Sequence, residues 1–205
     1  MNKNYPIIKK IYSRQILDSR GNPTIEVEVD VGDCFGRAAV PSGASTGEFE
    51  AIELRDKNNK RFHGKEVQTA VKNVIEVLQP KIIGKRSDQQ QEIDQILLEI
   101  DGTENKSNCG ANAILGVSMA CAVASSKFYN CSLYHYLNKD SSILPVPMIN
   151  VLNGGMHADS SSDIQEVMLF PCGAKSFSEA IRMGVEIFHE LKKELKSNGL
   201  NTTVG

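Results

Sequence analysis

The feature that most constrains the fold is a stretch of strict alternation, Thr24 to Val31, in which isoleucine and valine alternate with acidic residues. A period of two buries one face of a strand and exposes the other, so the stretch predicts a half-buried antiparallel β-strand. Gly32-Asp33 predicts a turn, and Cys34 to Pro41 predicts a partner strand. A weaker pattern from Ile7 to Leu17 adds a third strand, which makes an antiparallel meander.

Helical spacing replaces this alternation further along the chain. Apolar residues from Val67 to Leu78 recur at helical intervals, and Pro80 is expected to end that helix. Ser87 to Gln90 reads as a capping box for a helix that ends at Asp101-Gly102. An apolar, alanine-rich stretch from about 111 to 128 predicts a helix buried against its neighbours.

Strands followed by helices predict an α+β N-terminal domain over residues 1–139. A second domain is expected over 140–205, where Pro145 to Leu152 and Ile164 to Phe170 predict two strands. The connection between these strands has no helical pattern. Because parallel neighbours need a crossover of a dozen or more residues, usually a helix, the two strands are predicted to be antiparallel if they are adjacent.

An amphipathic helix follows the second of these strands. Ser176 to Glu179 predicts its N-terminal cap, and Gly199 suits its end. The expected apolar stripe consists of Phe177, Ile181, Val185, Phe188, Leu191 and Leu195.

The antiparallel pairing predicts a cluster of polar residues on one edge: His157 in the connection, with Gln165 and Glu166 at the entry to the second strand. A loop histidine can relay protons or contact phosphate, and it can equally be an exposed loop residue. Gln165 and Glu166 can face a substrate or only water. The aspartates at 159 and 163 lack a familiar calcium-loop spacing, which favours turn residues over a metal site.

Composition excludes several classes of function. A net charge of −2 gives no overall attraction to nucleic acid or to an acidic membrane surface. The run from Ala111 to Ala124 is too short to span a bilayer and contains polar residues, so no membrane span is expected. Five cysteines without a C-x-x-C pair, and no apolar signal core at the N-terminus, indicate free thiols in the cytoplasm. No phosphate-binding glycine motif and no Gly-x-Ser-x-Gly elbow occurs.

Several ungapped blocks resemble the enolase (phosphopyruvate hydratase) family. They begin at Asp18 (DSRGNPT), Pro41 (PSGASTG), Asp101 (DGTENKS), Gly110 (GANAILGVS) and Leu144 (LPVP), and the last is NGG at 153–155 followed by His157. The resemblance runs in order through all 205 residues. Two departures, the serines at 160–162 and Val167, affect loop and packing positions and remove no chemical group.

The resemblance implies a fold and a reaction. Enolases have an α+β N-terminal domain followed by an eight-stranded α/β (TIM-like) barrel whose second strand is antiparallel, so residues 140–205 would begin such a barrel. Their reaction is the reversible dehydration of 2-phosphoglycerate to phosphoenolpyruvate in glycolysis. It uses two Mg²⁺ ions, which stabilise the enediolate formed when a base removes a weakly acidic proton.

The resemblance also assigns roles to particular residues. The loop at 42–47 would act as a lid, with Ala44 touching substrate and Ser45 reaching the second Mg²⁺. His157 would contact the phosphate or the closed lid, Glu166 would help with the leaving hydroxyl, and Gln165 would contact substrate. The family also implies a homodimer formed through the N-terminal domain, and some enolases have a second location at the cell surface.

The family's general acid, base lysine and three carboxylates for the first Mg²⁺ would lie beyond residue 205, so this stretch alone is expected to be inactive. Two hypotheses follow. In the first, these residues are part of an enolase whose activity belongs to a longer chain. In the second, they form a non-catalytic module that binds a partner such as a full-length enolase or a surface receptor.

Overall fold

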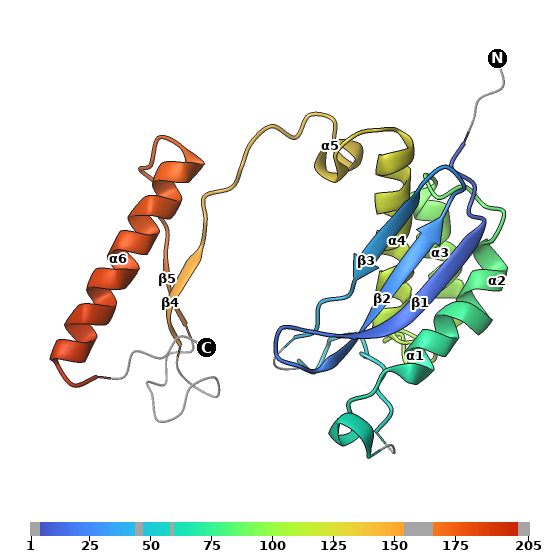
Figure 1. The fold of residues 1–205 in the computed structure, drawn as a ribbon, viewed down its shortest axis with the longest axis horizontal. Helices are drawn as coiled ribbons and strands as arrows, with labels where there is room; N and C mark the ends of the chain where they lie inside the picture. Colours follow the sequence, from blue (N-terminus) through green and yellow to red (C-terminus); the bar gives the residue numbers. More distant parts are fainter. Residues whose placement is uncertain (1–4, 44–46, 58–59, 154–165, 201–205) are drawn as a thin grey trace. The chain divides into compact units, whose positions relative to one another are not determined.

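The computed structural model describes residues 5–43, 47–57, 60–153 and 166–200. It divides into two compact units, Met1–Ser141 and Ser142–Gly205, and each is described by itself. Unit 1 is a sheet covered by helices, and the described part of unit 2 is a pair of antiparallel strands with one helix (Figure 1).

Unit 1 begins with the predicted antiparallel meander, which the structure confirms. Strands β1 (Lys10–Leu17), β2 (Pro23–Asp30) and β3 (Phe35–Ala39) pair in that order, with Ile11 opposite Val29 and Val27 opposite Ala38. The alternation in β2 works as predicted, because Ile25, Val27 and Val29 are fully buried. Burial of these three branched side chains contributes roughly 1.5–3 kcal/mol each.

Helices cover one face of this sheet (Figure 1). After a short 3₁₀ turn, η1 (Arg61–Gly64), a continuous helical segment comprises α1 (Gln68–Lys72), the π-helical η2 (Asn73–Leu78) and α2 (Gln79–Ile82). The prediction that Pro80 ends this segment is wrong, because the helix continues to Ile82. In π-helical pairing the missing N–H of Pro80 would leave the carbonyl of Ile75 without a donor, and the side-chain amide of Gln79 donates to that carbonyl at 3.3 Å.

The next helix, α3 (Gln90–Asp101), forms as predicted and ends at Gly102, which has the left-handed conformation expected of a helix stop. The predicted capping box is wrong. The N-cap is Gln89, without a side-chain cap, because the Ser87 hydroxyl is instead hydrogen-bonded to the Ser125 hydroxyl at 2.8 Å in the core.

Helix α4 (Ala111–Phe128) is the predicted buried helix, packed against β2 and β3. It is the one helix of the described residues long and apolar enough to cross a membrane by length and composition, and 61% of that stretch is buried within the protein. The run from Ala111 to Ala124, predicted from the sequence to be too short to span a bilayer, is only part of this 18-residue helix. A fully buried cysteine, Cys121, lies in α4, where burial raises the pKa of its thiol to about 12. All five cysteines are free, as predicted.

A short helix, α5 (Leu133–Leu137), completes unit 1. Unit 2 contains β4 (Ile149–Asn153), β5 (Glu166–Leu169) and α6 (Phe177–Ser197). The first strand is shorter than predicted, the second ends at Leu169 rather than Phe170, and its predicted start at Ile164 lies outside the described residues. The first begins at Ile149 rather than Pro145, since Pro145 and Pro147 carry no N–H for a ladder. Their antiparallel pairing is confirmed, with Ile149 opposite Leu169 and Asn153 opposite Glu166.

The hydroxyl of Ser176 accepts the N–H of Glu179, so the predicted cap of α6 is confirmed, and Gly199 follows the helix with a positive φ. The predicted stripe is only partly covered. The residues of α6 buried most deeply are Ala180 and Gly184, whereas Phe177, Ile181 and Val185 are exposed. The described part of unit 2 has two strands and no closed barrel.

Candidate functional site

Of the predicted site residues, only Glu166 lies in the described part of the chain. It is the first residue of β5, it is exposed, and it lies opposite Asn153, the last residue of β4. The expected meeting of the end of one strand with the start of the other is therefore confirmed for this pair. Ala44, Ser45, His157 and Gln165 lie outside the described residues, so their predicted roles stay predictions.

The residues before Ala44 are described, and a network of polar side chains holds them in unit 1. Strand β3 ends at Ala39, and Val40 still pairs with β2, since its N–H donates to Ile25 and its carbonyl accepts the Thr24 hydroxyl at 2.7 Å. Ser42 and Gly43 follow, and Nη2 of Arg20 donates to both of their carbonyls, at 2.9 and 3.1 Å. Hydrogen bonds therefore hold the main chain that follows β3 in place as far as Gly43.

A second arginine binds the side chain of Ser42. Nη2 of Arg55 donates to the Ser42 hydroxyl at 3.1 Å and to Oε1 of Glu53 at 2.7 Å, and the hydroxyl donates to Oε2 of Glu53 at 3.0 Å. Nη1 of Arg55 reaches the carbonyls of Pro23 and Lys65. The Arg55 side chain is only 17% exposed, so these charge-assisted hydrogen bonds join four segments of the unit in a partly dry environment.

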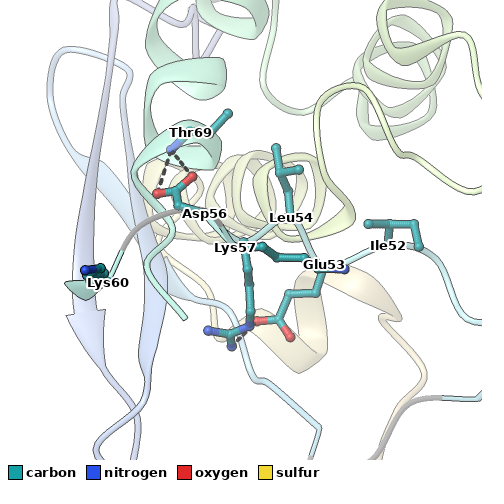
Figure 2. Close-up of a pocket in the computed structure, with 8 residues that line it drawn as sticks. Ile52, Glu53, Leu54, Asp56, Lys57, Lys60 and Thr69 are labelled. Atoms are coloured by element: carbon teal, nitrogen blue, oxygen red, sulfur yellow. Dashed lines mark hydrogen bonds and ion pairs between the residues drawn. The ribbon is translucent and has the colours of Figure 1, made fainter. Parts of the chain in front are cut away.

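Figure 2 shows the groove beside this network, with a volume of about 910 Å³. It is lined by Ile52, Glu53, Leu54, Arg55, Asp56, Lys57, Lys60 and Thr69. Its carboxylates already have partners: Glu53 pairs with Arg55, and Asp56 accepts the N–H groups of Gln68 and Thr69 at the start of α1. These acids support the local structure and leave little carboxylate chemistry for a ligand.

Residues 52–54, which line the groove, are also held by hydrogen bonds to other parts of unit 1. The side chain of Asn112, buried at the start of α4, accepts the N–H of Leu54 at 3.2 Å and donates to its carbonyl at 3.1 Å. The N–H of Ile52 donates to the carbonyl of Asn105. The chain is therefore held on both sides of the undescribed residues 44–46.

The described residues do not by themselves fit a Mg²⁺ ion. Within residues 5–43, 47–57, 60–153 and 166–200 no group of three or more histidine, cysteine, aspartate or glutamate side chains is placed to hold a metal. Magnesium requires six oxygen ligands in an octahedral arrangement, commonly with one or two carboxylates.

Both units of the chain match known protein families. Residues 8–137 match the family described as Enolase, N-terminal domain. The chain belongs to the enolase family. Residues 141–205 match a second description, Enolase, C-terminal TIM barrel domain, and this match covers part of the barrel. The enolase resemblance seen in the sequence blocks is confirmed.

Sequence reasoning assigned no role to Asp18, Arg20 or Arg55 in this enolase. The first two lie in the DSRGNPT block and were used only as evidence of resemblance. A signal was present, because that block and PSGASTG are both rich in polar residues and neither has helical or strand periodicity. The first block lies at the turn between β1 and β2 and the second begins just after β3, and antiparallel pairing brings both places to one end of the sheet, so the two blocks are good candidates for mutual hydrogen bonding.

Proposed function

We propose that this chain provides the N-terminal domain and the first part of the barrel of a catalytic enolase. The reaction is the Mg²⁺-dependent, reversible dehydration of 2-phosphoglycerate to phosphoenolpyruvate. The observation that carries the proposal is the match of two enolase family domains, in order, over residues 8–137 and 141–205. As a lyase of this type, the enzyme removes a proton and a hydroxyl from adjacent carbons of its substrate.

The chain's own residues have distinct roles in this proposal. Ala44 contacts substrate, and Ser45 would offer one hydroxyl ligand to Mg²⁺, which when bound would supply positive charge beside the reacting carbons. Gln165 orients the substrate, and His157 contacts its phosphate. Glu166 acts on the leaving hydroxyl, and its place at an exposed strand start leaves its carboxylate accessible. A single hydroxyl is not a magnesium site, so the remaining ligands come from elsewhere in the enzyme.

The proposal includes the inactivity of residues 1–205 on their own, because the family's base lysine, general acid and metal carboxylates are not assigned to any of these positions. We also propose that the enzyme acts in the cytoplasm as a homodimer formed through the N-terminal domain. Size-exclusion chromatography with light scattering measures that assembly directly.

Turnover of 2-phosphoglycerate with Mg²⁺ tests the function. It is measured on residues 1–205 alone and on the complete product of the gene that encodes them. We expect the complete product to be active, the Ser45→Ala variant to lose at least about tenfold in kcat/KM through the missing hydroxyl, and residues 1–205 to be inactive. A complete product without turnover would remove the catalytic proposal, and activity of residues 1–205 would remove the claim of inactivity.

A further inference from the structure

The guanidinium of Arg20 binds the main chain just before the proposed active-site residues. Its Nη2 donates to the carbonyls of Ser42 and Gly43, which lie 22 and 23 residues further along the chain. Ala44 comes directly after this pair of carbonyls. The direction in which the chain leaves β3 therefore depends on where the Arg20 side chain is held.

The turn between β1 and β2 holds Arg20 in place. Oδ1 of Asp18 accepts the N–H of Asn22 at 2.8 Å and that of Arg20 at 2.9 Å, and Oδ2 lies 3.4 Å from Nη2 of Arg20. The N–H of Asn22 is the main cause that lowers the pKa of Asp18, so this carboxylate is ionised at neutral pH. Gly21 adopts a φ of 75°, which permits the tight turn.

Global stability does not account well for this arrangement. The Arg20 side chain is 42% exposed, and exposed ion pairs contribute at most about 1 kcal/mol to folding. The hydrogen bonds to the two carbonyls both come from Nη2 of Arg20, a single nitrogen with two N–H groups in the guanidinium plane, and they bind two consecutive peptide groups. Such a contact defines the position of a short piece of main chain more than it stabilises the unit.

We propose that Arg20 is a positioning residue of the enolase: it fixes the Ser42–Gly43 main chain from which Ala44 and Ser45 reach the active site. This inference rests on the proposed function of those two residues. Arg20 acts through the main chain and does not itself touch substrate. Lysine keeps the charge but alters this contact, because its ammonium is a strongly hydrated point charge on a flexible stem and lacks the planar, pre-organised Nη2 group that donates to both carbonyls.

The first test uses hydrogen–deuterium exchange on the metal-free protein and requires no activity. Arg20→Lys should increase exchange in the peptide that covers residues 41–49 by about fivefold to tenfold, as expected for losing one or two charge-assisted hydrogen bonds at a partly exposed site. The matched control is Arg37→Lys, since Arg37 is 50% exposed and pairs with Glu28 on the same sheet. Unchanged exchange in Arg20→Lys would refute the inference.

The second test is a double-mutant cycle in the active gene product. Arg20→Lys should lower kcat/KM for 2-phosphoglycerate by about fivefold to tenfold while the midpoint of urea unfolding stays near that of the wild type. If Arg20 acts through the placement of Ser45, Arg20→Lys should add less than about twofold to the loss caused by Ser45→Ala. Arg37→Lys should have no effect in either background.

The outcomes separate the two proposals. If Ser45→Ala impairs turnover but Arg20→Lys does not, or if the two losses multiply in the double variant, Arg20 has no positioning role and the proposed function stands. If the wild-type gene product has no turnover, both proposals fall.

Discussion

Gly36 of β3 lies directly against main-chain atoms of helix α4, and replacing it with alanine should push the sheet and the helix apart. A Cβ at this position would lie 2.1 Å from the carbonyl oxygen of Ala120 and 2.2 Å from the nitrogen of Ala124. Both are main-chain atoms of α4, so no side-chain rotation relieves the overlap. Ordinary contact begins near 3.4 Å, which requires α4 or β3 to move by about 1.3 Å.

The cost of that movement can be worked out from the packing. A gap of 0.5–1 Å removes about a quarter to a half of the dispersion energy of the atoms that line it. Overpacking typically costs about 1–3 kcal/mol, and a clash with two main-chain atoms belongs at the upper end. We expect Gly36→Ala to lower the free energy of unfolding of unit 1 by about 3 kcal/mol. For a unit of this size the thermal midpoint then falls by about 10 °C.

The assay has to report on unit 1 alone. Cys121 is fully buried and lies in α4, so pulsed thiol labelling in urea, read by mass spectrometry, follows exposure of this core. Gly116→Ala is a graded comparison, because its Cβ would meet side-chain methyl groups of Val27 and Val40 that can shift, and about 1 kcal/mol is expected. Gly47→Ala is the control within unit 1, since its Cβ would come no closer than 3.6 Å to the side chain of Glu50. A loss below about 1 kcal/mol for Gly36→Ala, or equal losses in all three variants, would refute the reasoning.

Two further predictions concern a buried carboxylate and a helix cap. Asp101 is buried, and desolvation raises the pKa of its carboxyl group, but the N–H of Cys109 and other hydrogen bonds outweigh this and leave the pKa lowered. The ionised carboxylate therefore stabilises the folded state fully above the unfolded pKa of 3.8, and this stabilisation is lost as the pH falls through the folded pKa. Asp101→Asn should therefore cost about 2 kcal/mol at pH 6 in urea unfolding, with a smaller difference from the wild type below pH 3.8, and a difference that does not change with pH would contradict this account. Ser176→Ala removes the acceptor for the N–H of Glu179 and should cost about 1 kcal/mol, seen as faster amide exchange in the first turn of α6, whereas Ser178→Ala should leave that exchange unchanged.

Much of the fold could be predicted from the sequence because burial leaves a periodic trace. The alternation in β2 and the apolar run in α4 each encode which face meets the core, and both elements formed as expected. Ser87 was interpreted wrongly because the capping rule assumes a local partner, whereas its hydroxyl bonds that of Ser125, 38 residues away. Pro80 was interpreted wrongly because the rule assumes that the carbonyl it leaves without a donor stays unpaired, whereas the side-chain amide of Gln79 donates to that carbonyl.

The candidate site was less predictable than the fold for a related physical reason. Arg20 and Arg55 act on Ser42 and Gly43 across gaps of 13 to 23 residues, and hydrogen bonds between irregular segments have no period to detect. Family resemblance located the two sequence blocks involved but said nothing of the bonds between them.

Strand β3 connects the packing of the core to the proposed active-site residues. Gly36 sets the distance between β3 and α4, because the absence of a side chain there lets the two main chains come into contact. Three and four residues after the strand ends, Arg55 and Arg20 fix Ser42 and Gly43. A strand held at its middle and just past its end cannot tilt or slide independently of the sheet. The position of Gly43 is thus determined by apolar packing and by charge-assisted hydrogen bonds together, and the loss of either alone should loosen the entry to Ala44.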